Sequence, residues 1–498
     1  MRKNVLAIDF GASSGRAILG HYDGKTIFLQ EIHRFSNDPV QLGDTLYWDI
    51  LRLFHEVKQS LLKSKEFGDL DSVAVDTWGV DFALLDKDGR LLENPVHYRD
   101  PRTRGMIPEF ERYISSEKLY GITGIQPLEH NTLYQLLSLQ RSRPDLLERA
   151  NKLLMIPDLF SYFLCGEIHA ELSAASTTQL LDGERKEWSD KIIETLGIRR
   201  SLFPPLLPSG REIGTLSGAL CRELGMKPCK IIAACSHDTQ SAMAAVPAKE
   251  KDFIFLSSGT WSLLGTELEQ TVLTGAAQNS GLSNEIGFEG KTAFLKNING
   301  LWLIQESRRQ WKREGKDYSF AELEQLARKA APFRSFIDPD DHAFDQAGDL
   351  PGAVREYCKR TGQPSPESVG EVIRCIYESL ALRYRGAVEE IEQCTGKRYD
   401  TIHIVGGGTK DQFLSAMTAS ACKRRVVSGP AEATAMGNIV VQLITLGAIE
   451  NLSRARKLIA ESDNFLTFEP ENETAWDKAA AVYESILAHG RSDPKGGS

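Results

Sequence analysis

The chain opens with short apolar runs that alternate with turns rich in small residues. Val5–Phe10 is apolar except for Asp9, residues 11–15 are small, and residues 16–20 return to residues typical of strands. Apolar runs of this length, bounded by glycine and serine, predict strands joined by tight turns. Residues 26–35 continue in β-type residues after a further turn, so the first part of the chain predicts three successive strands.

A helical pattern follows these strands. Asp49–Lys65 has apolar residues at helical spacing, which predicts a helix with one buried face. The residues expected on that face are Leu51, Phe54, Val57, Leu61 and Leu62. Residues 72–76 and 230–235 are further apolar runs, each closed by polar residues. Strands and a helix in this order predict an α/β domain whose functional residues lie in turns at strand ends.

The opening pattern returns in the second half of the chain. Residues 253–256 form an apolar run, residues 257–260 are small and polar, and residues 261–265 are again mostly apolar. This order of strand, small-residue turn and strand echoes residues 6–20. The repeat predicts two related halves, each opening with a hairpin, with a boundary near residues 246–252.

A long helix is predicted further along the second half. Pro366–Cys394 has apolar residues at three- and four-residue steps, Ser365 is placed to cap the helix, and Gly396 follows its end. Residues 401–421 then predict a strand, a glycine turn and a second helix. Residues 491–498 are small or polar and are predicted to be frayed.

Composition narrows the class of protein. The 498 residues are 41% hydrophobic and 26% charged, which excludes long disorder. The formal net charge of −9 makes nucleic acid and membrane poor partners, and no apolar run approaches the ~20 residues of a membrane span. The N-terminal apolar run ends at Asp9, too early for a secretory core, so we expect a cytoplasmic protein. The eight cysteines lack zinc-binding spacing and are expected to be scattered thiols.

The turn after the first strand carries the first candidate chemistry. Asp9 closes an apolar strand, where a carboxylate is costly unless a cation or hydrogen-bond donors compensate it. Gly11 and Gly15 let the backbone approach a ligand, and successive amides with Ser13 and Ser14 suit an anion. The segment predicts either a nucleotide phosphate site with Mg²⁺ near Asp9 or a plain hairpin turn.

Other nucleotide and metal motifs are excluded by their spacing. Gly24–Thr26 and Gly290–Thr292 end like P-loops, but Leu19 and Glu285 stand where the first glycine belongs. The acidic run at residues 338–342 lacks the glycine and glutamate of an EF-hand. The H-E-x-x-H sequence of zinc hydrolases does not occur. Any phosphate site is therefore predicted to be of another type.

The second candidate site follows the apolar run at residues 230–235. Asp238 stands after this run between polar donors, which suits a general base acting on a bound hydroxyl that His237 and Thr239 position. A hydrolase triad is not indicated, because triad residues converge from separate loops and no G-x-S-x-G elbow is present. The other interpretation of this segment is a capped turn without chemistry.

Three further segments are candidate ligand contacts. Asp76–Gly79 offers a carboxylate, an aromatic face and a glycine, which suit a sugar, although a core Trp explains the segment equally well. Residues 406–408 are glycines between a strand and a helix, where a nucleotide can approach closely. Asn297 and Gln305 carry amides that suit a ligand, a helix cap or the surface.

These motifs, in this order, resemble the FGGY family of carbohydrate kinases. The resemblance runs through nearly the whole chain, and Asp76–Phe82 and Ser236–Thr239 are similar to the branch that acts on L-rhamnulose. The sequence departs from the family pattern at Thr409–Asp411, after the triple glycine. The matching segments are Asp9–Arg16, Asp76–Phe82, Tyr98–Asp100, Asn131–Gln135, Ser236–Thr239, Ser257–Ser262, His403–Gly408 and Gly429–Thr434.

The resemblance implies an α/β fold of two actin-like (RNase H-like) ATPase domains with a cleft between them. It implies a sugar-binding domain over residues 1–248, a nucleotide-binding domain over residues 249–450, and a helical extension and tail over residues 451–498. The implied activity is ATP-dependent phosphorylation of the C1 hydroxyl of L-rhamnulose, with Mg²⁺ as cofactor. The implied partners are a ketose and ATP, with no nucleic acid and no membrane.

The resemblance also implies roles for single residues. Asp238 would take the proton from the C1 hydroxyl, and Asp9 would anchor Mg²⁺. The residues implied to hold the sugar are Gly79, His237, Thr239 and Asn297. The residues implied to bind ATP are Ala12, Ser13, Ser14, Gly15, Arg16, Thr260, Gln305 and Gly407. The alternatives are a kinase for another ketose, such as L-fuculose or a pentulose, and a non-catalytic sugar sensor on the same fold.

Overall fold

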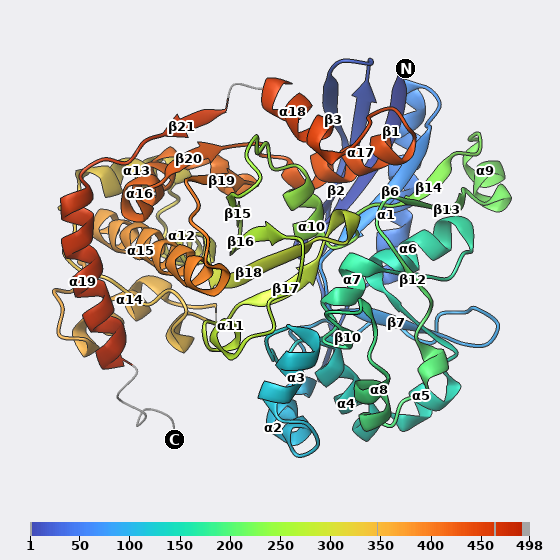
Figure 1. The fold of residues 1–498 in the computed structure, drawn as a ribbon, viewed down its shortest axis with the longest axis horizontal. Helices are drawn as coiled ribbons and strands as arrows, with labels where there is room; N and C mark the ends of the chain where they lie inside the picture. The colour runs from blue at the N-terminus through green and yellow to red at the C-terminus, as the bar shows by residue number, and fades with distance from the viewer. Residues whose placement is uncertain (1, 346, 463–464, 491–498) are drawn as a thin grey trace. The chain divides into compact units, whose positions relative to one another are not determined.

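The computed structural model describes residues 2–345, 347–462 and 465–490, and the tail predicted to be frayed lies outside them. The chain divides into two units, and each contains a β-sheet with helices (Figure 1). Unit 1 is made of the described residues within 1–249, 267–295 and 432–464. Unit 2 is made of those within 250–266, 296–431 and 465–498.

Unit 1 is built on a six-stranded sheet. Its strands, in spatial order, are β13 (Arg211–Thr215), β14 (Lys230–Ala233), β6 (Ser72–Thr77), β1 (Lys3–Phe10), β2 (Ser14–Tyr22) and β3 (Ile27–Ser36). β1 pairs antiparallel with β2, which confirms the predicted first hairpin, and parallel with β6. In this register Asp9 on β1 lies between Arg16 on β2 and Asp76 on β6. The sheet therefore gathers two carboxylates and a guanidinium from three strands.

Helices cover the sheet of unit 1. They are α1 (Ile50–Ser64), α6 (Ile156–Cys165), α10 (Asp238–Ala244) and α17 (Ala433–Thr445). α17 packs against β1 and β6 although it is far from them in sequence (Figure 1). The predicted helix is confirmed as α1, and Asp49 caps it by accepting a hydrogen bond from Arg52 N. The predicted buried face is only partly right, because Leu51 is 65% exposed while Val57 and Leu61 are fully buried.

Besides the hydrophobic core against the six-stranded sheet, unit 1 has another hydrophobic cluster, formed mainly by residues between 82 and 203. Four small two-stranded sheets accompany it, and their strands are β4 (Val40–Leu42), β5 (Thr45–Tyr47), β7 (Phe82–Leu85), β8 (Lys152–Met155), β9 (Ala170–Glu171), β10 (Leu181–Asp182), β11 (Glu187–Trp188) and β12 (Leu206–Leu207). The remaining α-helices of this unit are α2 (Met106–Glu111), α3 (Ser116–Thr123), α4 (Thr132–Ser142), α5 (Pro144–Arg149), α7 (Leu172–Ser176), α8 (Asp190–Thr195), α9 (Gly218–Leu224), α11 (Gly275–Asn279) and α18 (Leu452–Ser462).

The sheet of unit 2 repeats the opening hairpin. Its strands, in spatial order, are β18 (Thr292–Asn299), β16 (Trp261–Leu268), β15 (Ile254–Ser258), β19 (Thr401–Val405), β20 (Arg425–Ser428) and β21 (Leu466–Phe468). β15 pairs antiparallel with β16 and parallel with β19, as β1 does with β2 and β6, so the predicted repeat is confirmed. The first four residues of β18, 292–295, are counted in unit 1. There they pair antiparallel with β17 (Ser283–Ile286).

The long helix of unit 2 starts later than the sequence predicts. α15 spans Val369–Thr395, and Ser368 caps it in a capping box with Glu371. Ser365 and Pro366 therefore precede the helix, because the reciprocal bonds of Ser368 and Glu371 satisfy more of the free amides at its start. The remaining α-helices are α12 (Trp302–Arg313), α13 (Phe320–Lys329), α14 (Leu350–Arg360), α16 (Gln412–Cys422) and α19 (Glu473–Gly490).

Two further features concern the chain as a whole. Across the described residues, no helix combines the length and the apolar character that crossing a membrane requires. All eight cysteines are described and none forms a disulfide, although the thiols of Cys358 and Cys375 contact each other.

Candidate functional site

Asp238 is the first residue of α10, and four residues separate it from the end of β14 in the sheet of unit 1. The link between β14 and α10 is held by its backbone, since Thr77 N donates to Ser236 O at 2.9 Å and Ser236 N donates to Glu171 Oε2 at 3.1 Å. Asp238 Oδ1 accepts hydrogen bonds from Thr239 N at 2.6 Å and from Thr239 Oγ1 at 3.2 Å. Among the described residues no hydrogen bond reaches Asp238 Oδ2, so one carboxylate oxygen is held and the other is open.

The electrostatic surroundings of Asp238 suit a general base. Burial raises the pKa of Asp238 most, the charge of His237 lowers it, Asp9 raises it again, and the result is a pKa of about 6. The side chain is 30% exposed, so a ligand can reach it. At neutral pH the carboxylate is ionised but more basic than an ordinary Asp, which favours proton abstraction from a bound hydroxyl.

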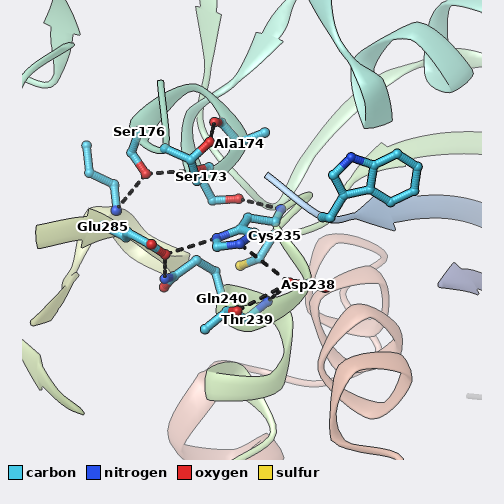
Figure 2. Close-up of polar contacts among 12 residues, drawn as sticks. Ser173, Ala174, Ser176, Cys235, Asp238, Thr239, Gln240 and Glu285 are labelled. Atoms are coloured by element: carbon cyan, nitrogen blue, oxygen red, sulfur yellow. Dashed lines mark hydrogen bonds and ion pairs between the residues drawn. The ribbon is translucent and has the colours of Figure 1, made fainter. Parts of the chain in front are cut away.

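His237 lies between two carboxylates. Its Nε2 is 3.4 Å from Asp238 Oδ1, and its Nδ1 is 3.0 Å from Oε2 of Glu285 on β17. Burial alone would lower the pKa of His237, but the charges of Glu285 and Asp238 raise it to about 9. Figure 2 shows Glu285 and Asp238 in one network with Gln240 and Thr239. Because protein carboxylates face both ring nitrogens, the imidazole contributes mainly a positive charge to this site.

Asp9 and Asp76 form a buried carboxylate pair near the carboxyl ends of two adjacent strands, β1 and β6. Asp9 is 4% exposed, and Arg16 Nε donates to its Oδ2 at 3.0 Å. Asp76 is fully buried; its Oδ2 accepts from Asn438 Nδ2 at 2.5 Å, and its Oδ1 has no hydrogen-bond partner in the described part of the chain. Burial and the neighbouring Asp9 raise the pKa of Asp76 well above its ordinary value. Such a pair is costly on its own, so it favours a bound cation.

The first hairpin exposes its tip. Ala12, Ser13 and Ser14 are exposed between β1 and β2, and Gly11 N donates to Ser14 O at 2.9 Å. Asn37, which is 1% exposed, holds this tip with two hydrogen bonds. Its Nδ2 donates to Gly11 O at 2.8 Å, and its backbone N donates to Ser13 O at 3.1 Å. Amides and hydroxyls in a rigid exposed turn suit an anionic group.

Two residues next to the hairpin tip have additional contacts. A Cβ atom on Gly15 would lie 2.3 Å from the Phe35 ring, so only glycine fits at this position. Arg16 makes ion pairs with both Asp9 and Glu432 and is therefore held at the base of the turn.

Trp78 and Gly79 directly follow β6 and lie near the buried carboxylate of Asp81. Asp81 Oδ2 accepts hydrogen bonds from Trp48 Nε1 at 2.7 Å and from Trp78 Nε1 at 3.0 Å, and burial raises the pKa of Asp81 to about 6. The rings of Trp48 and Trp78 lie 4.0 Å apart between centroids. A Cβ atom on Gly79 would lie 2.9 Å from Thr177, so glycine is required here by packing. Trp78 is thus largely a buried residue with a fixed orientation.

The predicted nucleotide contacts of unit 2 lie near its own hairpin and glycine turn. Thr260, at the tip between β15 and β16, donates to Gln305 Oε1 at 3.4 Å, and Leu301 N donates to Gly259 O at 3.0 Å. Gly407 is exposed, and a Cβ atom there would meet nothing within 4 Å. Asn297 is the exposed residue of β18.

The glycine turn of unit 2 is tightly built. A Cβ atom on Gly408 would lie 2.0 Å from Ser258 Oγ, and Gly406 has a φ of 87°. Asp411, in the segment that departs from the family pattern, accepts from Leu414 N at 2.9 Å and caps α16. Asp411 therefore has a structural role as the N-cap of α16.

Comparison with protein families covers nearly the whole chain. The N-terminal domain of the "FGGY family of carbohydrate kinases" matches residues 4–245, and the C-terminal domain of the same family matches residues 254–446. The chain belongs to the FGGY family of carbohydrate kinases. Kinases of this family use ATP, so the predicted enzyme class and nucleotide are confirmed at that level.

Full-length FGGY relatives are similar along both halves. A rhamnulokinase of Bacteroides thetaiotaomicron is 41% identical over 98% of this chain and 100% of its own length. A rhamnulokinase of Halalkalibacterium halodurans is 42% identical over 92% of this chain and 97% of its own length. A rhamnulokinase of Bacillus subtilis is 37% identical over 94% of this chain and 95% of its own length.

Solved FGGY kinase structures share the fold. The xylulose kinase of Lactobacillus acidophilus superposes with a TM-score of 0.83 at 16% identity, covering 99% of both chains. The glycerol kinase of Plasmodium falciparum, solved with ADP, superposes with a TM-score of 0.79 at 16% identity, covering 98% of both chains. The predicted fold class of two α/β domains is confirmed.

The structure distributes the predicted site residues of this FGGY kinase between the two units. Unit 1 holds Asp9, Ala12, Ser13, Ser14, Gly15, Arg16, Gly79, His237, Asp238 and Thr239. Unit 2 holds Thr260, Asn297, Gln305 and Gly407. Of the four implied sugar contacts, three therefore share unit 1 with Asp238, and only Asn297 lies in unit 2. The ligand role of each residue stays a prediction.

Sequence reasoning missed four polar residues that the structure connects to this site. They are Asn37, Asp81, Glu285 and Asn438. Asp81 stands inside the matching segment Asp76–Phe82, so its position there was a usable signal. The other three are far in sequence from the residues they contact, and only the folded sheet brings them close.

Proposed function

We propose that this FGGY kinase transfers the γ-phosphate of ATP to the C1 hydroxyl of L-rhamnulose and forms L-rhamnulose 1-phosphate. The observation that supports it most directly is the Asp238 carboxylate, which Thr239 holds through one oxygen and which lies 3.4 Å from His237 Nε2. The similarity to proteins named rhamnulokinase over nearly their full lengths supports this sugar among the ketoses. The ATP-dependent reaction places the protein in the cytoplasm under this proposal.

In the proposed reaction Asp238 is the base. Its open Oδ2 accepts the proton of the C1 hydroxyl while that oxygen attacks the γ-phosphorus, and ADP leaves with the electrons of the broken P–O bond. Phosphoryl transfer asks the protein mainly to align the two oxygens and to balance charge. The hydrogen bonds from Thr239 to Asp238 Oδ1 fix the direction in which Oδ2 points.

The proposed sugar site lies around Asp238. Gly79, His237 and Thr239 share unit 1 with the base, and Asn297 is the proposed contact from unit 2. Trp78 is buried against Trp48 and hydrogen-bonded to Asp81, so its proposed role is to support the neighbouring Gly79 and not to offer a face to the sugar. The N-terminal family domain is accordingly the proposed sugar-binding part and the C-terminal family domain the proposed nucleotide-binding part.

Phosphate contacts are proposed in each of the two units. The exposed tip at Ala12, Ser13 and Ser14 supplies amides and hydroxyls, and Gly15 and Arg16 complete this proposed set. The proposed contacts from unit 2 are Thr260, Gln305 and Gly407. A charged guanidinium at the base of the tip favours an anion there.

The residues near Asp9 fit a magnesium ion that arrives with the nucleotide. Asp9 and Asp76 are adjacent on neighbouring strands, and Asp76 Oδ1 has no hydrogen-bond partner among the described residues. No group of three or more metal-binding side chains occurs in the described part of the chain, which fits a metal that binds one or two carboxylates and substrate phosphates. When bound, Mg²⁺ neutralises charge on the phosphate oxygens.

A coupled assay of ADP release over a panel of ketoses tests the proposal. The panel contains L-rhamnulose, L-fuculose and pentuloses at saturating ATP and Mg²⁺, and Asp238→Asn is measured in parallel. We expect the highest kcat/KM with L-rhamnulose and a phosphate ester at C1 by phosphorus–proton NMR coupling. A higher kcat/KM with another ketose overturns the choice of sugar. The absence of sugar-dependent ADP release at high protein concentration overturns the kinase proposal in favour of a sugar sensor.

A further inference from the structure

A buried carboxylate outside the predicted site contacts the residue next to the base. Glu285 on β17 is 8% exposed, and its Oε2 lies 3.0 Å from His237 Nδ1. The same oxygen accepts a hydrogen bond from Gln240 Nε2 at 2.8 Å (Figure 2). Neither the predicted sugar contacts nor the predicted base accounts for this carboxylate.

We infer that Glu285 is a positioning residue that keeps the His237 imidazole protonated and turned toward Asp238. Glu285 does not touch the reacting atoms in this inference and acts only through His237. The inference rests on the proposed function, because a charged and oriented His237 affects the reaction only if its neighbour Asp238 is the base. The contacts that carry it are all formed within unit 1.

Two carboxylates at ion-pair distance favour the charged form of the imidazole. A neutral imidazole has one N–H donor and one lone pair, whereas a protonated one has two donors. Carboxylate oxygens lie at 3.0 Å from Nδ1 and at 3.4 Å from Nε2 of His237. In either neutral tautomer one carboxylate would therefore face a lone pair. Neither contact is an aligned hydrogen bond, and Nδ1 has no hydrogen-bond partner in the described part of the chain, so the two carboxylates act on the ring through their charge, which favours the imidazolium.

The frame around this group is rigid. His237 N donates to Ser173 Oγ at 3.1 Å, and Ile286 N, next to Glu285, donates to Ser176 Oγ at 3.0 Å. Both serines belong to the short helix α7, so one element holds the backbones of the imidazole and of its carboxylate partner. The side chains consequently have little freedom to separate.

Other ionisable groups face this network from several elements. Glu171 on β9 faces His237, while Asp9 on β1, Asp76 on β6 and Tyr98 face Asp238. The oxygens of Glu171 are occupied by neutral donors, among them Ser173 Oγ, Ser209 Oγ and Ser236 N. Glu285 is therefore the carboxylate that contacts His237 Nδ1 directly, and Asp9 and Asp76 add negative charge on the side of the base.

Loss of the Glu285 charge should change the pKa of Asp238 through its effect on His237. Burial lowers the pKa of His237 and raises that of Asp238, and the attraction between the two charges opposes both effects. If His237 becomes neutral, the pKa of Asp238 rises further and less of the base is ionised at neutral pH. A purely structural role for Glu285 would weaken the fold without moving either titration.

The experiment compares Glu285→Gln with Glu285→Asp and with a matched control. Glu56→Gln removes the charge of another glutamate paired with a histidine, because Glu56 Oε2 lies 2.7 Å from His33 Nε2 in the same unit. Ring NMR of the labelled histidines, with His237→Asn used only to assign the signal, gives the pKa of His237. Coupled ADP assays give kcat and KM against pH for each variant, and thermal unfolding reports folding.

We expect His237 of the unaltered protein to titrate above pH 8, and Glu285→Gln to lower that pKa by about 1 to 3 units. We expect kcat at pH 7 to fall about 10- to 100-fold, with the acid limb moved to higher pH and a smaller change in the sugar KM. Glu285→Asp should restore part of both effects, and Glu56→Gln should change neither.

Several results overturn the inference. They are a His237 that titrates at or below the ordinary value near 6.5 in the unaltered protein, an unchanged acid limb in a folded Glu285→Gln, and an equal effect of Glu56→Gln. The titration of the unaltered protein can overturn the inference even if Glu285→Gln does not fold. It needs no sugar, so a failure of the proposed function leaves this part of the test intact.

Discussion

Replacing Asp238 by Asn is expected to remove activity and to stabilise the fold at the same time. The amide keeps the shape of the side chain but cannot accept the hydroxyl proton, so kcat should fall about 10²- to 10⁴-fold. The effect on stability follows from the pKa of Asp238, which burial raises from the ordinary 3.8 to about 6. A raised folded-state pKa means that the ionised carboxylate destabilises the folded protein at neutral pH.

The magnitude follows from the same two pKa values. The difference between 3.8 and about 6 corresponds to about 3 kcal/mol of destabilisation at neutral pH, an upper figure because the side chain is 30% exposed. Folding binds a proton between these two values, so the penalty is absent below pH 3.8, grows as the pH rises, and is complete above about pH 6. Asp238→Asn removes this penalty, and the gain in stability should follow the same pH course.

The assay pairs ADP release with thermal unfolding between pH 4.5 and 8. Asp23→Asn is a suitable control, because hydrogen bonds from the backbone of Thr26 and Lys25 hold the pKa of Asp23 below its ordinary value. That control should keep activity and should not raise the unfolding temperature. Near-normal turnover of Asp238→Asn removes Asp238 from the role of base. A gain in stability that is no larger at pH 8 than at pH 4.5 refutes the electrostatic reasoning.

The remaining predictions concern the base, the hairpin tip and the packing of one glycine. In the unaltered protein, kcat/KM should decrease when the pH is lowered through about 6, because Asp238 becomes protonated there. An acid limb near pH 4 would exclude Asp238 as the titrating group. Asn37→Ala removes the hydrogen bond from Asn37 Nδ2 to Gly11 O and should raise the KM for ATP about 3- to 10-fold. An equal rise in the KM for the sugar would show that the substitution disturbs the whole unit and not the hairpin tip alone. Gly15→Ala forces a Cβ atom against the Phe35 ring and should cost about 1–3 kcal/mol in chemical unfolding; recovery is expected in Gly15→Ala with Phe35→Leu, and its absence refutes the steric cause.

Local patterns were sufficient for the elements that carry the site. The apolar runs predicted β1, β2, β6 and β14; Asp9 was marked as the polar residue near the end of β1, and Asp238 as the polar residue after the run that forms β14. The helix α15 was predicted, but its start was placed too early because Ser365 and Ser368 are both acceptable caps and only the reciprocal bonds with Glu371 select Ser368. A local pattern cannot choose between two competing caps of similar quality.

Contacts between distant segments could not be predicted from one sequence. Asn438 reaches Asp76 because α17 packs on the sheet of unit 1, and Glu285 reaches His237 because β17 lies beside α7. In the sequence, Glu285 is visible only as the residue that breaks a P-loop pattern. Its partner is set by the register of strands that are far apart in the chain, and no spacing rule contains that information.

The charges of unit 1 explain how a chain of net charge −9 can offer a site to anionic ATP. Asp9, Asp76, Asp238 and Glu285 are all at least largely buried, and burial penalises each ionised form. Two cations offset this penalty in different ways: Arg16 pairs with Asp9 at the foot of the hairpin tip, and His237 lies between Glu285 and Asp238. Arg16 is a permanent cation beside the proposed phosphate contacts, whereas the charge of His237 exists only because two carboxylates sustain it. The carboxylates that make this unit costly to fold therefore also create the positive charge that keeps its base ionised.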